Sequence, residues 1–256
     1  MLQSSIPLRY FLQLSFKGTA YHGWQRQRNA MSVQQILDET LSKLLKENIL
    51  TSGAGRTDTG VHARVFYAHF DTKHEALHKT EIVYRLNSML PFDIAIQRIF
   101  PVKDDAHARF DATSRTYEYV ISRTKDPFLK DYTCYLYGEL DLEKMNEAAQ
   151  LLLGTKDFGC FSKSRTQVKT NICTVISAEW IAKDHRLIFT ITADRFLRNM
   201  VRAIVGTHIE LGQDKITLDD YIAVIKGRNR SDAGYSVPAE GLSLMDIQYK
   251  ERIRGH

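Results

Sequence analysis

Hydrophobic residues recur at helical spacing directly after Ser32. The apolar positions on this face are Val33, Ile36, Leu37, Leu41, Leu44 and Leu45. Such spacing places them on one side of a helix. Ser32 with Gln35 forms the pattern of a capping box, in which the serine hydroxyl accepts a backbone N–H bond at the first turn. The sequence therefore predicts an amphipathic helix that begins after Ser32.

Residues typical of β-strands surround this helix in the first hundred positions. The predicted strands are Leu8 to Phe16, Arg64 to Thr72 and Ile94 to Phe100. A further helix is predicted from Thr80 to Leu90, because Pro91 cannot continue it. Strands and helices thus alternate in this part of the chain.

The second part of the chain also combines predicted strands and helices, but these elements differ in length from those of the first part. The predicted strands are Thr116 to Ser122, Cys173 to Ala182, Leu187 to Thr192 and Ser243 to Tyr249, and the predicted helices are Leu142 to Leu153 and Thr217 to Lys226. Asp141 is placed to cap the first helix and Gly154 to follow its end. The second helix has a Thr-x-x-Asp start that ends in Asp220, and Gly227 stands at its other end.

This order of elements predicts an α+β fold in two similar halves. The boundary is expected between Pro101 and Phe110, which gives an N-terminal domain of residues 1–105 and a C-terminal domain of residues 106–256.

Composition narrows the class of protein. The chain has 256 residues, of which 43% are hydrophobic and 25% are charged, which are average values for soluble globular proteins and exclude disordered and collagen-like classes. The longest apolar run is Tyr221 to Ile225, whereas a membrane helix needs about 20 such residues. No signal peptide is apparent in Met1 to Tyr10, so we expect a cytoplasmic protein.

Cys134, Cys160 and Cys173 match no disulfide or zinc spacing and are expected as buried free thiols.

The charge balance favours a polyanionic partner without requiring one. Lysine and arginine total 35 against 30 aspartate and glutamate, a formal net charge of +5. Nucleic acid is one partner that such a surface attracts.

The segment from Gly53 to Ala63 is the most unusual of the chain. Gly53, Gly55 and Gly60 frame Arg56 and Asp58. Glycines let a backbone approach a ligand closely. A surface turn with an Asx-type hydrogen bond from the aspartate is the plainer alternative.

Two known motifs fit this segment poorly. A Gly-x-Gly-x-x-Gly phosphate loop needs glycine where Asp58 stands, and it should precede a helix. Asp58-Thr59-Gly60 matches the aspartic-protease triplet, but that chemistry needs two carboxylates that share a proton, and a neighbouring Arg56 keeps a carboxylate ionised.

A third motif, His74-Glu75-Ala76-Leu77-His78, matches the zinc-protease pattern His-Glu-x-x-His. That pattern works inside a long helix with a further ligand. Here it lies in a short polar connector, so we expect solvated histidines and no metal.

Arginine and tyrosine spacings offer possible contacts to RNA. Arg195, Arg198 and Arg202 would form one basic stripe on a helix, suited to phosphate contact or to a buried carboxylate partner. Tyr117 and Tyr119 share one strand face, where an exposed pair could stack bases. Core or cross-strand tyrosines are the alternative.

Several of these segments together resemble the TruA family of tRNA pseudouridine synthases over nearly the whole chain. The similar motifs are Tyr21-His22-Gly23-Trp24-Gln25, Gly55 to Ala63, Ala112 to Tyr119, Phe196 to Gly206 and Glu240 to Leu244. The family usually has Asp-Ala-Gly in the second motif, where this chain has Thr59.

The resemblance implies the pseudouridine synthase fold, with two mixed subdomains of antiparallel sheet flanking a central basic cleft, and conversion of uridine to pseudouridine without cofactor or metal. Asp58 would be the catalytic carboxylate. Arg202 would be its basic partner, Tyr117 would stack on the target base, and Leu244 would wall the pocket.

The resemblance also implies the partners. Arg56 would help to extrude the nucleotide, while Arg195 and Arg198 would contact the RNA backbone. The substrate would be the anticodon arm of tRNA at positions 38 to 40, bound by a homodimer. A non-catalytic RNA-binding protein of the same fold is the alternative function.

Overall fold

A computed structural model describes residues 7–163 and 170–250 of the chain, which divides into two units. Unit 1 comprises Met1–Thr113 and Asp246–His256, and unit 2 comprises Ser114–Met245. The expected domains of residues 1–105 and 106–256 were consecutive, whereas the end of the chain returns to unit 1. Residues 1–6 and 251–256 of those domains lie outside the described residues.

Side-chain contacts explain why unit 1 extends past the expected boundary. The backbone N–H of Ala108 donates to Nδ1 of His69 at 3.2 Å. The hydroxyl of Tyr249 donates to the carbonyl of Ala108 at 2.6 Å. These bonds join the connecting segment and the last strand to the same sheet, which sequence periodicity does not reveal.

The sheet of unit 1 has the order β4-β1-β3-β10, with β2 paired to β3. Its strands are β1 (Leu8–Phe16), β2 (Ser52–Gly53), β3 (His62–Thr72), β4 (Ile94–Pro101) and the last residues of β10 (Leu242–Tyr249). Strand β1 runs antiparallel to both β3 and β4, and β2 runs antiparallel to β3. The predicted β1, β3 and β4 are confirmed within two residues at each end, while the two-residue β2 is too short to show periodicity.

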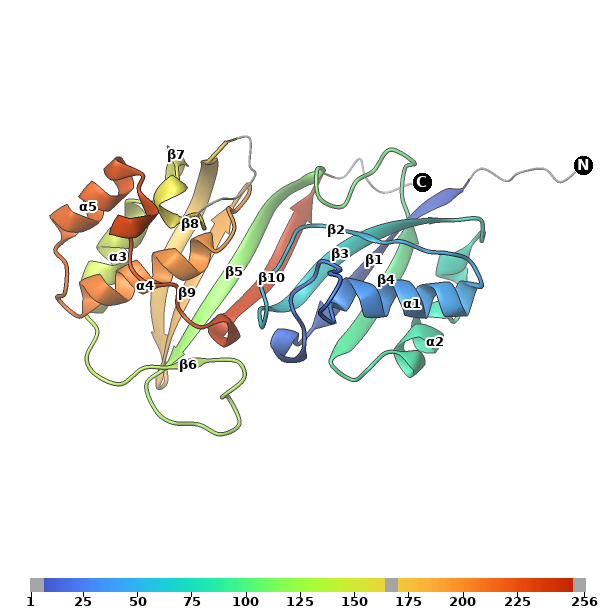
Figure 1. The fold of residues 1–256 in the computed structure, drawn as a ribbon, viewed down its shortest axis with the longest axis horizontal. Coiled ribbons are helices and arrows are strands. Elements are labelled where there is room, and N and C mark those ends of the chain that lie inside the picture. Colours follow the sequence, from blue (N-terminus) through green and yellow to red (C-terminus); the bar gives the residue numbers. More distant parts are fainter. Residues whose placement is uncertain (1–6, 164–169, 251–256) are drawn as a thin grey trace, which may run out of the picture. The chain divides into compact units, whose positions relative to one another are not determined.

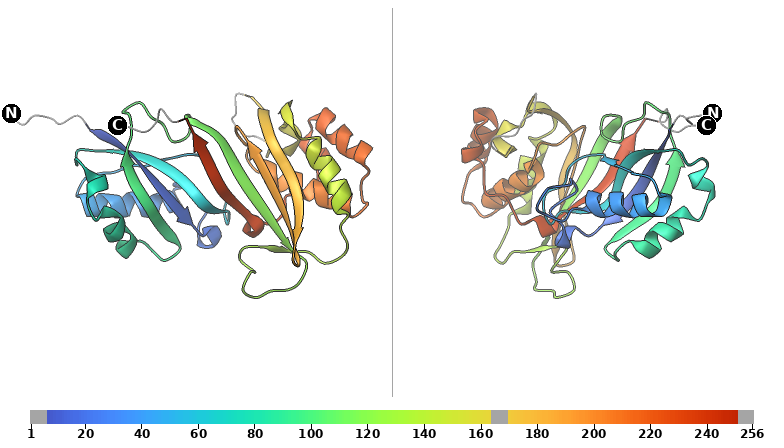
Figure 2. Two further views of the ribbon diagram at one scale, coloured as in Figure 1. Left: turned by 180° about the vertical axis from the view of Figure 1, so that it is seen from behind. Right: turned by 45° about the vertical axis from the view of Figure 1, so that its right-hand side comes forward.

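Helices α1 (Val33–Leu45) and α2 (Ile82–Met89) cover one face of this sheet (Figures 1 and 2). Short 3-10 turns occur at Gly18–Ala20 and Leu77–Lys79. The Ser32 hydroxyl accepts the backbone N–H of Gln35 at 3.3 Å, so the predicted start of α1 is confirmed. The Gln35 amide, however, donates to Glu39 at 3.0 Å.

In unit 2 the strand order runs from the first residues of β10 through β5, β9 and β8 to β7. The strands are β5 (Ala112–Ser122), β6 (Cys134–Tyr135), β7 (Gly154–Asp157), β8 (Ile172–Lys183) and β9 (Arg186–Ala193). Strand β6 pairs in parallel with β5, whereas the pairs β5 with β9, β9 with β8 and β8 with β7 are antiparallel. Both units combine antiparallel strands with helices, which confirms the α+β fold class.

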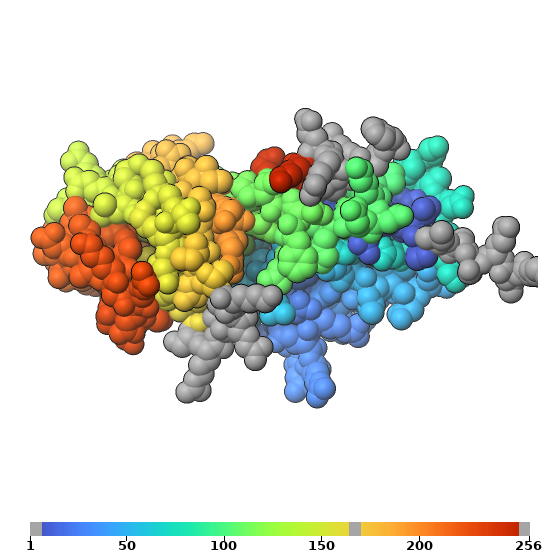
Figure 3. Space-filling model, turned by 90° about the horizontal axis from the view of Figure 1, so that it is seen from above, coloured from blue at the N-terminus to red at the C-terminus, as the bar shows by residue number. Residues whose placement is uncertain are grey.

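Three helices of unit 2 contact one another, α3 (Leu142–Gln150), α4 (Met200–Gly212) and α5 (Leu218–Gly227). In the space-filling view, residues around 140–160 and 215–235 are among those at the surface of this unit on the face shown (Figure 3), whereas α4 is almost wholly buried. The remaining 3-10 turns are Gly159–Phe161, Arg230–Asp232 and Ala239–Gly241.

Capping signals mark the helix starts of unit 2 more accurately than their ends. Asp141 accepts the backbone N–H of Lys144 at 3.0 Å, and Thr217 with Asp220 forms the complete capping box. Helix α3 ends at Gln150, three residues before the predicted end, and Gly154 begins β7 with φ of +88°. Gly154 is therefore the first residue of strand β7 and does not end helix α3.

The three cysteines are free thiols. Cys160 and Cys173 are buried, and burial raises the pKa of each thiol to about 11. Cys134 is half-buried, so its expected burial is only partial. Within residues 7–163 and 170–250, no helix is long and apolar enough to cross a membrane.

Candidate active site

Asp58 lies in the connection between β2 and β3 of unit 1, which we call the Asp58 loop (residues 54–61). The Asp58 side chain is half-buried, while Arg56 and Thr59 are exposed. Thr59, which replaces the alanine usual in the resembled family, therefore has room at the surface. The loop presents a carboxylate and a guanidinium two residues apart.

The Tyr21–Gln25 motif holds this loop by main-chain hydrogen bonds. The backbone N–H of Trp24 donates to the hydroxyl of Thr57 at 3.0 Å. The N–H of Gly60 donates to the carbonyl of Tyr21 at 3.3 Å, and the N–H of Val61 closes a turn on the carbonyl of Asp58 at 3.2 Å. Both sides of Asp58 are thereby fixed to a segment more than thirty residues earlier in the chain.

Gly23 of this motif and Gly18 shortly before it must be glycine. Gly23 has φ of +81°, and a Cβ atom there would lie 2.2 Å from the carbonyl oxygen of Thr57. A Cβ atom on Gly18 would lie 2.0 Å from the carbonyl oxygen of Val61. Real Cβ atoms do not approach backbone oxygens so closely, so the loop packs against the motif only because side chains are absent.

An aromatic cluster supports the loop from within unit 1. The Trp24 ring lies 4.3 Å from the Phe66 ring and 6.3 Å from the Phe16 ring, centroid to centroid. The hydroxyl of Tyr21 donates to Asp93 at 2.5 Å, and burial, followed by this bond, raises the pKa of Tyr21. The sequence interpretation did not single out Asp93, because nothing in its spacing marks it as a partner of Tyr21.

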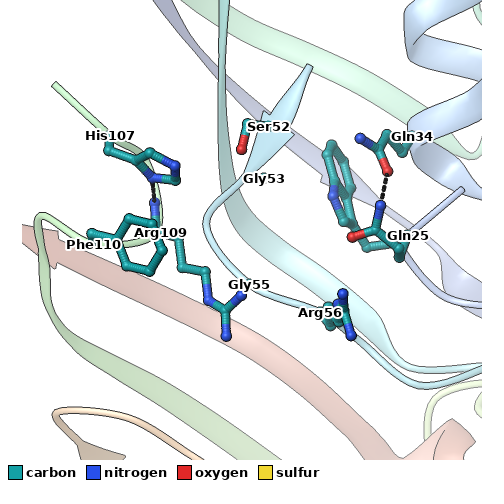
Figure 4. A pocket seen from close by; sticks show the side chains of 10 residues that line it. Gln25, Gln34, Ser52, Gly53, Gly55, Arg56, His107, Arg109 and Phe110 are labelled. Atoms are coloured by element: carbon teal, nitrogen blue, oxygen red, sulfur yellow. Dashed lines mark hydrogen bonds between the residues drawn. The ribbon is translucent and has the colours of Figure 1, made fainter. Parts of the chain in front are cut away.

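A pocket of about 170 Å³ opens beside Arg56, which we call the Arg109 pocket (Figure 4). Its lining residues are Trp24, Gln25, Gln34, Ser52, Gly53, Gly55, Arg56, His107, Arg109 and Phe110. All of them belong to unit 1. The sequence interpretation missed the residues from His107 to Phe110, although an arginine followed by an aromatic residue directly before the Ala112 motif was a signal available there.

Tyr117 lies on β5 of unit 2 and is half-buried. Its ring meets the Phe196 ring edge to face, with centroids 5.1 Å apart and planes at 85°. Tyr119 on the same strand is fully buried, and its hydroxyl donates to the carbonyl of Pro238 at 2.9 Å. An exposed pair of tyrosines is therefore wrong, since Tyr119 belongs to the core.

The predicted helical stripe of arginines is also wrong. Helix α4 begins at Met200, so only Arg202 is helical, while Arg195 and Arg198 precede it in irregular structure. Asn199 adopts φ of +68° at the N-cap, which interrupts any helix through this segment. The Asp194 carboxylate, directly after strand β9, accepts the backbone N–H of Arg195 at 2.7 Å.

The three arginines differ in exposure. Arg198 is exposed and Arg195 is half-buried, with its guanidinium donating to the carbonyl of Thr170 at 3.3 Å. Arg202 is half-buried, and its Nε donates to the carbonyl of Val237 at 2.7 Å. Leu244, near the start of β10, is 2% exposed, and its role as a pocket wall stays a prediction.

The two units contain the predicted site residues separately. Arg56 and Asp58 belong to unit 1, whereas Tyr117, Arg202 and Leu244 belong to unit 2 together with Arg195 and Arg198. The cleft that would join them stays a prediction.

The His74–His78 motif does not form the helix that the zinc-protease pattern needs. Nε2 of His74 bonds the carbonyl of Leu45 at 2.8 Å, and Ala76 has φ of +55°, so the segment is not a continuous helix. In the part of the chain that the structure describes, no group of three or more His, Cys, Asp and Glu side chains could hold a metal.

Sequence comparison now decides the family. The profile of the family described as tRNA pseudouridine synthase matches residues 14–111 and 148–250. The chain belongs to this family. Pseudouridine synthases are isomerases, and the matched ranges include Asp58, Arg202 and Leu244, while Tyr117 lies between them.

Individual relatives of this family match almost end to end. A protein named tRNA pseudouridine synthase A from Bacteroides fragilis is 48% identical over 246 residues, covering 96% of this chain and 98% of its own. One of the same name from Bacteroides thetaiotaomicron is 49% identical over 248 residues, covering 96% and 92%. A more distant match is the crystal structure of a Cbf5-Nop10-Gar1 complex, with a TM-score of 0.36 and 12% identity over 93% of this chain and 59% of that one.

Proposed function

We propose that this member of the family isomerises uridine to pseudouridine in the anticodon arm of tRNA, at positions 38, 39 and 40, with Asp58 as the catalytic carboxylate. The observation that carries the assignment is the Asp58 loop, in which a bond from Trp24 to Thr57 and a bond from Gly60 to Tyr21 flank one half-buried carboxylate. A surface turn needs no such support from a distant motif.

The chemistry is a rearrangement within one nucleotide. The C1′–N1 glycosidic bond breaks, the uracil turns, and a C1′–C5 bond forms while the C5 proton leaves and N1 gains a proton. Atoms and electrons balance without a cofactor. An ionised Asp58 has the charge needed to act as a nucleophile, either on C1′ or on the ring.

Residues of unit 2 would complete the site. Arg202 would keep the Asp58 carboxylate ionised through its positive charge. Tyr117, which is half-buried against Phe196, would stack on the uracil and take part in proton transfer. Leu244 would exclude water from the reacting centre.

Substitution of the carboxylate tests the proposal against a non-catalytic RNA-binding protein. Asp58→Asn keeps the size of the side chain and removes its charge. We expect single-turnover tritium release from labelled tRNA to fall by at least about 10³-fold while tRNA affinity is retained. Equal activity of both proteins would contradict the catalytic assignment, and no activity in either would favour the binding protein.

Substitution of Tyr117 tests its proposed part in proton transfer. Tyr117→Phe keeps the ring against Phe196, so binding should persist while the single-turnover rate falls. An unchanged rate would remove the hydroxyl from the mechanism.

The proposed function includes a homodimer that acts in the cytoplasm, with Arg56 helping to extrude the nucleotide and with Arg195 and Arg198 attracting the RNA backbone. Arg198 is exposed, so Arg198→Ala should weaken tRNA binding and reduce the salt slope by about 0.7–0.9. Analytical ultracentrifugation of the protein with and without tRNA tests the dimer.

A further inference from the structure

We propose that the Arg109 pocket binds one nucleotide of the RNA strand close to the target uridine, with its phosphodiester between Arg56 and Arg109 and its base against Phe110. This inference rests on the proposed function and adds a binding site that the catalytic assignment does not require.

The pocket has the chemistry of an anion site. Its ten lining residues include two arginines and no aspartate or glutamate. Arg56 and Arg109 come from segments more than fifty positions apart in the sequence, and both side chains border the same space beside Gly55 (Figure 4). Guanidinium groups bind phosphate with two parallel hydrogen bonds, and a phosphodiester is the anion that RNA supplies at every nucleotide.

Gly53 and Gly55 contribute main chain to the wall of the pocket. A Cβ atom on Gly53 would lie 2.3 Å from Nε1 of Trp24, so this position cannot carry a side chain without displacing the indole. At Gly55 a Cβ atom would meet nothing within 4 Å, which shows open space on that side. A sugar-phosphate group can therefore approach the backbone at Gly55.

Hydrogen bonds fix the segment that carries Arg109. The N–H of His107 donates to Asp111 at 2.7 Å, and the N–H of Arg109 donates to Nδ1 of His107 at 3.1 Å (Figure 4). Because Nδ1 of the neutral ring accepts, the ring proton is on Nε2. Burial is the first cause that lowers the pKa of His107 and favours this neutral form.

Phe110 provides a stacking surface beside these donors. It is 74% exposed, although its ring lies 4.3 Å from the His107 ring and the guanidinium carbon of Arg109 lies 5.7 Å from its centre. Aromatic side chains next to a cationic groove are the usual platform for single-stranded bases. Phe110 thus suits the base of one nucleotide, and Arg109 suits its phosphodiester.

The pocket lies near the catalytic carboxylate along the chain. Gly55 and Asp58 are three residues apart, so their Cα atoms lie at most about 11 Å from each other. A nucleotide in the pocket is therefore a near neighbour of the target uridine.

A thermodynamic cycle tests the phosphate contact. Anticodon stem-loops that carry one neutral methylphosphonate at successive positions are bound to the protein with Asp58→Asn, alone and combined with Arg109→Ala. We expect Arg109→Ala to weaken binding about tenfold and one methylphosphonate to weaken it at least as much, with a combined loss smaller than the product of the two because only the Arg56 contact to that phosphate remains. Additive losses at every phosphate would overturn the proposal.

A charge-matched control comes from the same unit. Arg85 is exposed on α2 and outside the pocket, so Arg85→Ala should leave the affinity within about twofold. Arg109→Ala should also reduce the salt slope by about 0.7–0.9 and Arg85→Ala should not. Equal effects of the two variants would show general attraction and contradict a defined subsite.

The stacking part has its own variants. Phe110→Tyr keeps an aromatic ring and should keep the affinity, whereas Phe110→Leu should weaken binding about tenfold. A 2-aminopurine placed beside the phosphate found above should be quenched by the wild type and not by Phe110→Leu. Unquenched fluorescence with the wild type would contradict base stacking.

Failure of this proposal is distinguishable from failure of the proposed function. If the wild type forms pseudouridine and the cycle is additive, only the pocket assignment falls. If the cycle shows the coupled phosphate and no pseudouridine forms, the pocket stands and the catalytic assignment falls. Binding of a nucleoside monophosphate that Arg109→Ala abolishes, together with an additive cycle, would assign the pocket to a small molecule and overturn the RNA proposal.

Discussion

The Asp58 loop of unit 1 and the segment 194–199 of unit 2 hold predicted site residues by different means. In the first, main-chain contacts predominate, and Gly23 meets the carbonyl of Thr57 where no side chain would fit. In the second, side chains hold the backbone, since Asp194 accepts from the N–H of Thr174 at 2.8 Å and the Asn199 amide donates to Ser236 at 2.6 Å.

This difference teaches what each region tolerates. A loop packed by backbone contact fails when a carbon atom is added, because the main chain has no rotamer with which to move away. A segment held by polar side chains fails when an acceptor is removed, because buried N–H groups then lose their partners. Substitutions can therefore separate the two modes.

The largest effect is expected from Gly23→Ala. The new Cβ atom would lie 2.2 Å from the Thr57 oxygen at φ of +81°, so we expect a loss of about 3 kcal/mol in the free energy of unfolding. Urea denaturation measures it. Gly55→Ala, which meets nothing within 4 Å, is the control and should lose less than about 1 kcal/mol. Equal losses would show that close packing does not hold the loop.

A buried histidine gives unit 2 a pH dependence of stability. His208 accepts from the Trp180 indole at 3.0 Å and bonds the Tyr221 hydroxyl at 2.9 Å, and burial lowers its pKa to about 3. The unfolded state binds a proton below pH 6.5 while the folded state does not, so stability falls as the pH falls.

Between pH 7 and pH 5 this one group should cost about 2 kcal/mol. The change in unfolding free energy between these pH values should be smaller by that amount in His208→Gln. An identical change in wild type and variant would show that His208 becomes protonated in the folded state at pH 5.

An intermediate effect is expected from Asp194→Ala, which removes one acceptor from two backbone N–H groups. We expect a loss of about 1.5 kcal/mol in unfolding free energy, and a smaller loss for Asp194→Asn, whose amide oxygen still accepts. Chemical denaturation of the three proteins checks the order. Identical stability of Asp194→Ala and the wild type would contradict side-chain control of this segment.

The smallest effects are expected from surface ion pairs in either unit. Arg9 contacts Asp71 through two nitrogens at 2.7 and 2.8 Å, and Lys144 contacts Asp214 at 2.5 Å. Because all four side chains are partly exposed, Arg9→Met and Lys144→Met should each change stability by less than about 1 kcal/mol. A loss of several kcal/mol in either variant would show that a surface pair contributes as much as backbone packing.

Local signals in the sequence located most elements. Ser32, Asp141 and Thr217 each accept the backbone N–H bond that their positions predict, because capping involves residues only three apart. The short strands β2 and β6 were not predicted, since two residues carry no periodicity.

Errors arose where a regular pattern met a local interruption. The spacing of Arg195, Arg198 and Arg202 fits a helix, yet the left-handed backbone of Asn199 starts α4 only at Met200. The alternation of Tyr117 and Tyr119 correctly places both on β5, but it cannot tell which one packs into the core.

The sequence by itself determined the α+β class, the capped helices and, through its motifs, the family and the candidate carboxylate Asp58. Only the tertiary structure decided that Gly23 and Trp24 hold the Asp58 loop and that Tyr249 bonds the last strand to unit 1. It also decided that Arg109 and Gly55 line the same pocket. The physical reason is range. Caps and periodicity act over a few residues, whereas these contacts join positions separated by thirty or more, where only the folded chain brings them together.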